Sequence, residues 1–168
     1  MSIITSKELF VVVEGGTLYI KKWLPENPKI TSPIVLVHDS LGCVDLWKDF
    51  PEHLARSLSC IVIAYDRLGF GRSSVNKNTP NANFVWDEAD CYFPNIKLAA
   101  QFNRYYLFGH SVGGAMSIGI AASDKDCIGV ITESAQSFVE DLTIKGIQEA
   151  QTLFQHPKQM ERLTKWHG

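Results

Sequence analysis

The sequence predicts an open, mostly parallel α/β sheet that begins with an antiparallel hairpin. Two strand-like runs, 8–13 and 17–23, flank Glu14-Gly15-Gly16, where adjacent glycines can take the positive φ angles of a hairpin turn. Further along, short continuous apolar runs alternate with helix-like segments, which is typical of buried parallel strands and the helices that cover them. Catalytic groups are then expected at the carboxyl ends of the strands.

The first half of the chain shows this alternation clearly. A linker with three prolines, from Pro25 to Pro33, is expected to extend neither neighbouring strand, and the apolar run Ile34–Val37 predicts a central parallel strand. A helix is predicted from about Phe50 to Ser57, with Pro51 in its first turn. The run Cys60–Tyr65 predicts another buried strand, and an Asn-rich surface loop follows its turn.

The second half continues the pattern. Residues 84–102 have a helical pattern interrupted at Pro94, which predicts a kinked helix or two shorter ones. A further parallel strand is expected at Ile128–Thr132. Two amphipathic helices are expected after it, separated at Pro157, at Val139–Gln155 and Lys158–Trp166.

The stretch from Tyr105 to Ala122 carries the strongest functional signal. An apolar run, Tyr105–Phe108, breaks at Gly109-His110-Ser111-Val112-Gly113-Gly114 and resumes as a helix-like segment. The pattern G-x-S-x-G fits a strand–turn–helix junction because the backbone at the serine is strained and neighbouring chain passes close to positions 109 and 113. Ser111 is then expected at the apex as a nucleophile. A flexible loop and a phosphate-binding helix start are the alternatives.

Composition indicates one soluble globular domain. The chain has 168 residues, 45% hydrophobic and 20% charged, with a net charge of −2 and no basic stripe. This argues against nucleic acid or an anionic membrane as a partner and favours small neutral or weakly charged substrates. Four dispersed cysteines form no C-x-x-C pair, so we expect free thiols, no metal and no cofactor. The N-terminus resembles no signal peptide and no run could span a bilayer, which favours the cytoplasm.

Three motifs in order resemble the α/β-hydrolase superfamily over the whole chain. His38-Asp39-Ser40-Leu41-Gly42 resembles its oxyanion loop, residues 66–73 resemble its D-x-x-G-x-G-x-S turn, and Gly109–Gly114 resembles its nucleophile elbow. Residues 46–51 and 138–142 are similar to bacterial members that degrade acyl-homoserine-lactone signals. The resemblance implies an α/β-hydrolase fold and serine-dependent hydrolysis.

The same resemblance implies roles for individual residues. Ser111 becomes the nucleophile, and the backbone N–H groups of Val112 and Ser40 become the oxyanion hole. Many relatives have glycine where Asp39 stands, so Ser40 and Leu41 both remain candidates for the second donor.

The family's acid and histidine normally follow the seventh and eighth strands. This chain is expected to stop after a sixth strand, so residues 1–135 are predicted to form part of the hydrolase core and 136–168 an incomplete lid. We therefore expect an inactive fragment of a longer hydrolase. The sixth strand is expected to form an apolar edge along which two copies could pair as a homodimer.

The five histidines are the candidates for the missing base. His38 and His110 lie in turn motifs, where packing or hydrogen bonding is the expected role, and His53 is expected on the surface of a helix. His156 and His167 fall in the lid segment, with no preceding strand to fix an imidazole near the serine.

Acidic residues also lie near the predicted strand ends. Glu133 follows the sixth strand, where some relatives place the acid, although a lid or loop contact is the alternative. Asp66 and Arg67 are expected to hold a turn together.

The leading functional hypothesis is a serine hydrolase of carboxylic esters or lactones, including signal lactones, acting through an acyl-enzyme. Acyl transfer, C–C bond hydrolysis and perhydrolysis share this elbow and stay open. A ligand-binding or interaction protein that keeps the fold without turnover is the alternative. Apolar residues of the lid segment are candidates to line an acyl site, with ordinary core as the other interpretation: Phe138, Val139, Leu142, Ile144, Leu153, Phe154 and Trp166.

Overall fold

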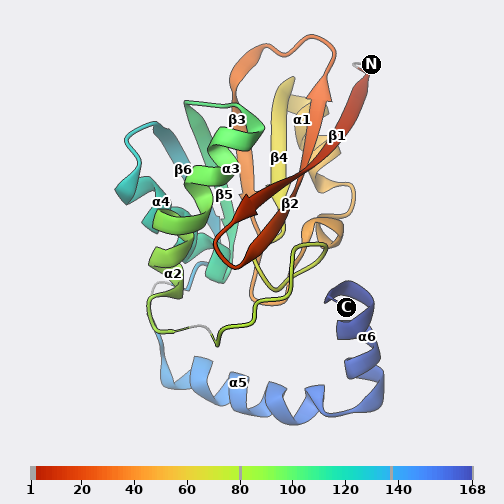
Figure 1. The fold of residues 1–168 in the computed structure, drawn as a ribbon, viewed down its shortest axis with the longest axis vertical. Helices are drawn as coiled ribbons and strands as arrows, with labels where there is room; N and C mark the ends of the chain where they lie inside the picture. The colour runs from red at the N-terminus through yellow and green to blue at the C-terminus, as the bar shows by residue number, and fades with distance from the viewer. Residues whose placement is uncertain (1–2, 80, 137, 168) are drawn as a thin grey trace.

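Six strands form one sheet in the order β1-β2-β4-β3-β5-β6 (Figure 1). The computed structural model describes residues 3–79, 81–136 and 138–167. β1 pairs antiparallel with β2 and β2 with β4, whereas β4, β3, β5 and β6 run parallel. The strands are β1 (Ile4–Val13), β2 (Gly16–Pro25), β3 (Ile30–Val37), β4 (Cys60–Tyr65), β5 (Tyr105–His110) and β6 (Cys127–Glu133). The predicted hairpin and mostly parallel sheet are confirmed.

Helices connect the parallel strands and follow the last one. In chain order they are η1 (Val44–Trp47), α1 (Phe50–Leu58), α2 (Phe84–Asp87), η2 (Glu88–Tyr92), α3 (Phe93–Ala100), α4 (Val112–Ser123), α5 (Asp141–Phe154) and α6 (Pro157–His167). Pro51 and Pro157 lie in the first turns of α1 and α6, where a missing N–H breaks no intrahelical hydrogen bond.

The linker before β3 is shorter than the sequence predicts. β2 extends to Pro25 and β3 already begins at Ile30, so Pro33 lies inside the strand. The pairing of β3 with β4 shifts register between Ile30 and Ile34. A proline is tolerated there because an irregular stretch of strand does not require its N–H for the ladder.

The helical region 84–100 changes its winding before Pro94. η2 is a π-helical turn, and α3 starts at Phe93 with the proline in its first turn. The expected interruption is therefore present, but a π turn just before the proline produces it. An extra residue in one turn lets the helix reach the proline without a clash against the preceding carbonyl.

Two apolar layers cover the two faces of the sheet. On one face, Leu36, Val62 and Ala64 pack with Ala55 of α1. On the other face, strand residues pack against α3 and α4, through side chains such as Ile96 and Met116 that are almost fully buried. Burial on both faces explains why β3, β4 and β5 are continuous apolar runs.

Helices α5 and α6 extend away from the sheet and form an arch below it (Figure 1). No residue described in either helix is buried. Among the described residues, no helix combines the length and apolarity needed to cross a bilayer. The arch lies opposite the loops that follow β3 and β5, because residues of α6 and of both loops line one cavity.

Candidate active site

Ser111 occupies a sharp turn between β5 and α4. Its backbone has φ 54° and ψ −122°, a conformation that costs an L-residue energy and that persists only where neighbouring contacts fix it. The Ser111 N–H donates to the carbonyl of Glu133 (2.9 Å), and the Ser111 carbonyl accepts from the N–H groups of Gly114 (2.9 Å) and Gln136 (3.3 Å). The end of β6 and the segment after it therefore hold the turn in its strained form.

Two glycines allow the surrounding chain to approach this turn. A Cβ built on Gly109 would lie 2.3 Å from the carbonyl oxygen of Gly113, and one built on Gly113 would lie 2.2 Å from the carbonyl oxygen of Val37. Real Cβ atoms do not come that close to backbone. The close approach predicted on both sides of the serine is confirmed, and it fits α4 tightly against the end of β3.

A cavity of about 490 Å³, which we call the serine cavity, opens above Ser111. Ser40 and Ser111 both line it, so the oxyanion loop and the elbow meet as the strand order requires. Its remaining wall comes from the end of α5 and from α6. The lining residues are Asp39, Ser40, Leu41, Leu46, His110, Ser111, Ser134, Phe154, Gln159, Arg162, Leu163, Trp166 and His167.

The loop after β3 contains both candidates for the second oxyanion donor, Ser40 and Leu41. Asp39 Oδ1 accepts a hydrogen bond from the N–H of Leu41 at 3.2 Å, which closes a local Asx turn. The Leu41 N–H is therefore engaged within the loop, and the pair of oxyanion donors expected from the sequence, the N–H groups of Ser40 and Val112, stays a prediction. Asp39 therefore shapes the loop through its own side chain.

Asp39 also reaches the residue that precedes the nucleophile. Its Oδ2 lies 3.4 Å from Nδ1 of His110, and both side chains are partly exposed to the serine cavity. A carboxylate beside Nδ1 orients an imidazole and leaves Nε2 free, which is the arrangement of carboxylate and base in hydrolytic triads. Sequence reasoning missed this pair, because nothing in the spacing of residues 39 and 110 places them together.

Behind the loop lies a buried pair, His38 and Arg67. The backbone N–H of Arg67 donates to Nε2 of His38 (3.1 Å). The carbonyl oxygen of Asp39 lies 2.8 Å from His38 Nδ1 and also accepts a hydrogen bond from Nη2 of the Arg67 guanidinium (2.6 Å). Burial, and then the charge of Arg67, hold the pKa of His38 well below its ordinary value of 6.5. His38 is thus a neutral hydrogen-bonding residue, as the sequence predicts.

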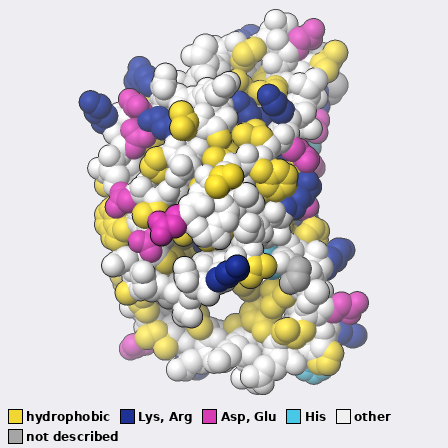
Figure 2. All heavy atoms as spheres, viewed as in Figure 1, with side chains coloured by type: hydrophobic (Ala, Val, Ile, Leu, Met, Phe, Trp, Pro, Cys, Tyr) yellow, Lys and Arg dark blue, Asp and Glu magenta, His cyan; other side chains and the backbone are white. Residues whose placement is uncertain are grey.

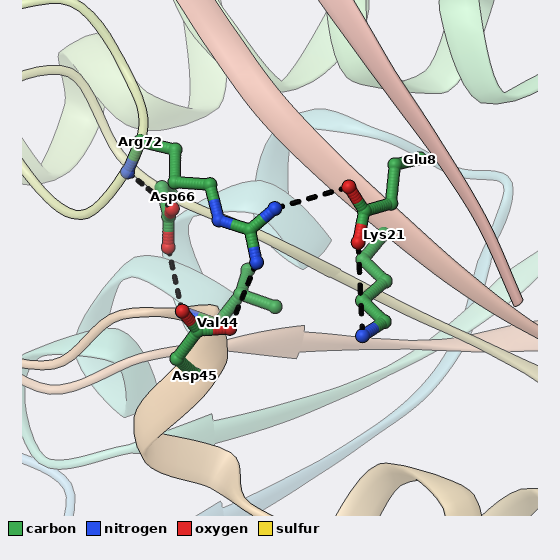
Figure 3. Close-up of polar contacts among 6 residues, drawn as sticks. All are labelled: Glu8, Lys21, Val44, Asp45, Asp66 and Arg72. Carbon is green, nitrogen blue, oxygen red and sulfur yellow. Dashed lines mark hydrogen bonds and ion pairs between the residues drawn. The ribbon is translucent and has the colours of Figure 1, made fainter.

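Asp66 fastens the turn after β4 to the rest of the site (Figure 3). Its carboxylate accepts from the backbone N–H groups of Val44 (2.6 Å) and Arg72 (2.8 Å). The Arg72 guanidinium pairs in turn with Glu8 (3.0 Å) and Asp45 (3.2 Å). Burial raises the pKa of Asp66, although the two N–H donors oppose the shift. The predicted turn-holding role of Asp66 is confirmed.

The remaining candidates for acid and base lie in different places. His53 is exposed on α1 and pairs with Asp49 (3.2 Å). His156 lies between α5 and α6, and Glu133 contributes its backbone carbonyl to Ser111 while its side chain is exposed. Neither Glu133 nor His156 lines the serine cavity.

His167 is placed more firmly than the sequence suggests. Its Nδ1 accepts from the N–H of Gly71 (3.1 Å), its Nε2 lies 3.1 Å from the Leu41 carbonyl, and its ring meets Phe70 edge-on. A neutral imidazole with its proton on Nε2 satisfies both contacts. Within the described residues, the Ser111 hydroxyl neither caps α4 nor hydrogen-bonds any of the histidines.

Of the predicted lid residues, Phe154 and Trp166 line the serine cavity. Phe138 and Val139 line a different cavity beside α4. The other three lie on α5 and line neither cavity, and all three are exposed: Leu142, Ile144 and Leu153.

Comparison with known proteins agrees with this architecture. A sequence profile described as the alpha/beta hydrolase fold matches residues 32–163. The chain belongs to this family. The rat (Rattus norvegicus) protein 1-acylglycerol-3-phosphate O-acyltransferase ABHD5 is 28% identical over 113 residues, which cover 67% of this chain and 32% of that protein. The chain thus spans about a third of the length of this curated relative.

Solved structures share the fold at low sequence identity. A proline iminopeptidase of Mycobacterium smegmatis matches with a TM-score of 0.66 and 19% identity, over 92% of this chain and 58% of that one. The N-acyl homoserine lactonase AidH matches with a TM-score of 0.58 and 18% identity, over 79% of this chain and 46% of that one. These likenesses show the hydrolase fold.

Proposed function

We propose that Ser111 is the nucleophile of a serine hydrolase that cleaves carboxylic esters or lactones through an acyl-enzyme. The observation that carries this proposal is the strained backbone of Ser111 at the apex of the β5–α4 turn, on the wall of the serine cavity. In the reaction, Ser111 Oγ attacks the carbonyl carbon, and its proton passes to a base. The N–H groups of Val112 and Ser40 hold the oxyanion. The tetrahedral intermediate then collapses: the bond between the carbonyl carbon and the alcohol oxygen breaks, and that oxygen takes the proton from the base. Water attacks the resulting acyl-enzyme, its proton passes through the base to Ser111 Oγ, and the carboxylic acid is released.

The part of the proposal that concerns lactones is supported by the similarity to solved structures. AidH is named as an N-acyl homoserine lactonase, and a Bacillus subtilis carboxylesterase, CesB, matches with a TM-score of 0.56. We propose signal lactones as one substrate class on this ground. The acyltransferase name of the rat relative keeps acyl transfer to a second alcohol open.

We expect turnover by the 168-residue chain to be slow. A serine hydroxyl without a hydrogen-bonded base is a weak nucleophile, and loss of a triad member costs on the order of 10³-fold or more in rate. His110 and His167 both line the serine cavity, but the described contacts direct them to Asp39, Gly71 and Leu41. Covalent labelling is therefore a better first test than multiple turnover.

A fluorophosphonate probe tests the nucleophile directly. We expect the probe to label the wild-type chain and to leave Ser111→Ala unlabelled. Ser123→Ala is the matched control, because Ser123 is exposed at the end of the same helix and should leave labelling unchanged. Labelling that persists in Ser111→Ala, or none in the wild type, would refute the proposal.

One observation favours a second candidate function, a ligand-binding protein that does not turn over its ligand. That observation is the Ser111 hydroxyl without a hydrogen-bonded histidine in the described part of the chain. Titration calorimetry with N-hexanoyl homoserine lactone separates the two candidates. Saturable binding without released acid supports the binding protein, whereas stoichiometric acylation of Ser111 supports the enzyme.

A further inference from the structure

A further cavity lies at the amino ends of the parallel strands, at the opposite edge of the sheet from Ser111. It has a volume of about 340 Å³, and we call it the α3-end cavity because the last residue of α3, Ala100, and the turn after it form one wall. Another wall comes from β3, whose pairing with β4 skips from Ile30 to Ile34. Strand β5 separates Arg104 on this cavity from Ser111 by about 20 Å, at about 3.3 Å per residue. The α3-end cavity is therefore distinct from the serine cavity.

The charged side chains on the wall of the α3-end cavity are basic. Lys22 of β2 and Arg104 line it, and no aspartate or glutamate among the described residues does. Lys7 lies directly opposite Lys22 in the pairing of β1 with β2, so a third cation stands beside Lys22. None of the three forms an ion pair with a described carboxylate. Figure 2 shows dark blue lysine and arginine side chains near the top of the face in view, where Figure 1 has the end of α3 beside β2.

Lys22 has hydrogen-bond donors to spare. Its Nζ donates to the carbonyl of Ala100 (2.6 Å), which satisfies one acceptor in the last turn of α3. An ammonium group has three donors, and this carbonyl is its only hydrogen-bond partner among the described residues. Burial, and then the charge of Lys7, lower the pKa of Lys22. An anion would stabilise this half-buried ammonium, because it would supply the missing acceptors and offset the repulsion from Lys7.

The rest of the lining suits a phosphate with an organic group attached. Neutral polar side chains offer hydroxyl and amide donors, and the guanidinium of Arg104 can bind two phosphate oxygens at once. Ile61 and Phe102, both half-buried, give the same cavity an apolar part. A volume of about 340 Å³ falls within the range of about 300–1,000 Å³ that is typical of small-molecule sites. The neutral polar lining residues are Thr31, Ser32, Gln101 and Asn103.

We infer that the α3-end cavity binds a small molecule that carries a phosphate monoester. The phosphate lies against Lys22 and Arg104, and the organic group lies against Ile61 and Phe102. A phosphate monoester has a charge of about −1.5 to −2 at pH 7, which complements a site with cations and no carboxylate. This inference concerns a second site and does not depend on the chemistry of Ser111.

Titration of the whole chain with phenyl phosphate tests the site. We expect the backbone amide NMR signals of Ser32 and Asn103 to shift. Inorganic phosphate should bind about fivefold less tightly, because it has no group to place on the apolar part of the cavity. Phenol should leave both signals unchanged, because it lacks the phosphate. Added sodium chloride should weaken the binding of phenyl phosphate, since the ions screen its attraction to the cations.

Two substitutions and a control test the location. Arg104→Gln should weaken the binding of phenyl phosphate about tenfold, and the fold should persist because Arg104 is exposed. Lys22→Met keeps an unbranched side chain without the ammonium and should cause a similar loss. Arg162→Gln is the matched control, because it removes an exposed arginine from the serine cavity and should keep the affinity.

Four outcomes would overturn the inference or a part of it. Unchanged affinity in Arg104→Gln, or a tenfold loss in Arg162→Gln, would overturn the location. Equal binding of phenol and phenyl phosphate would overturn the recognition of phosphate. Equal binding of inorganic phosphate and phenyl phosphate would overturn the organic ligand and assign the site to free phosphate.

Discussion

Gly113 shows how one missing Cβ positions the elbow. A Cβ there would lie 2.2 Å from the carbonyl oxygen of Val37 and 2.5 Å from that of His38, so Gly113→Ala must push α4 away from β3. We expect a loss of about 3 kcal/mol or more of unfolding free energy. Equilibrium unfolding in urea measures this difference in unfolding free energy between Gly113→Ala and the wild type.

Gly146 on α5 is the matched control for that substitution. Among the described residues, nothing lies within 4 Å of a Cβ built at this position. Gly146→Ala should therefore gain about 0.5–1 kcal/mol, because alanine loses less backbone entropy than glycine in a helix. Equal stability of Gly113→Ala and Gly146→Ala would contradict the close packing of α4 on β3.

His38 should make stability depend on pH. Its pKa in the folded state lies well below 6.5 because of burial and Arg67, so the unfolded chain binds more protons below pH 6.5. The free energy of unfolding should therefore fall as pH falls from 6.5, by at most about 1.4 kcal/mol per pH unit. His38→Gln should flatten this dependence between pH 6.5 and 5.

Ser123, which is exposed at the end of α4 and does not titrate, supplies the control for the pH experiment. Ser123→Ala should keep the wild-type slope. An unchanged slope in His38→Gln, measured by urea unfolding at several pH values, would show that His38 takes up its proton in the folded state.

Single residues were predictable where a local pattern constrains them. The glycines around Ser111 follow from the sterics of a tight turn, and the hydrogen-bonding role of His38 follows from its place in a loop. The Asp39 contacts with Leu41 and His110 were not predictable. They depend on side-chain directions at the ends of two different strands, which sequence spacing does not encode.

Helix α6 is held over the site by its last described residue. His167 contacts Gly71 and Leu41, and no residue described in α6 is buried. Loss of about 1 kcal/mol of hydrogen bonding in His167→Ala should make the helix open about fivefold more often. Amide hydrogen exchange over residues 157–167 should be faster by that factor.

Glu161→Ala is the control that separates a loss of the contacts that dock α6 from a loss of stability within the helix. Glu161 is exposed on α6, so its replacement should leave exchange over 157–167 nearly unchanged. Equal exchange in both variants would mean that α6 docks without His167, for instance through Trp166 on the cavity wall.

Elements with a clear hydrophobic period were predicted well, and irregular ones were not. The strands from Ile34 to Val37 and from Cys60 to Tyr65 were found as expected, since burial on both faces demands continuous apolar residues. The π turn at Glu88–Tyr92 was not expected, because one extra residue in a turn hardly changes a helical period.

At the scale of the whole molecule, strand order explains why distant motifs meet. β3 lies between β4 and β5, so the loops after His38, Asp66 and Gly109 emerge at one edge of the sheet. This convergence follows from the alternation of strands and helices and was predictable. The two helices of the arch, α5 and α6, were expected from the sequence as part of a lid, but the contacts that hold them were not, because an amphipathic helix specifies a face to bury and leaves its partner undetermined. The contact of His167 with Leu41 joins residues 126 positions apart.

The edge of the sheet at β6 leads us to a prediction about how two copies of the chain assemble. β6 lies at one end of the sheet order and pairs with β5 in the described part of the chain, and Cys127–Glu133 contains no lysine, arginine or proline to protect an edge. We predict that two copies pair antiparallel along β6, which extends the sheet across a two-fold axis. Ile131, 60% exposed, should tolerate lysine, and the like charges in Ile131→Lys should shift the mass measured by light scattering toward 18.8 kDa. Leu98→Lys on α3 should keep the wild-type mass. A wild-type mass of 18.8 kDa at every concentration would refute the pairing.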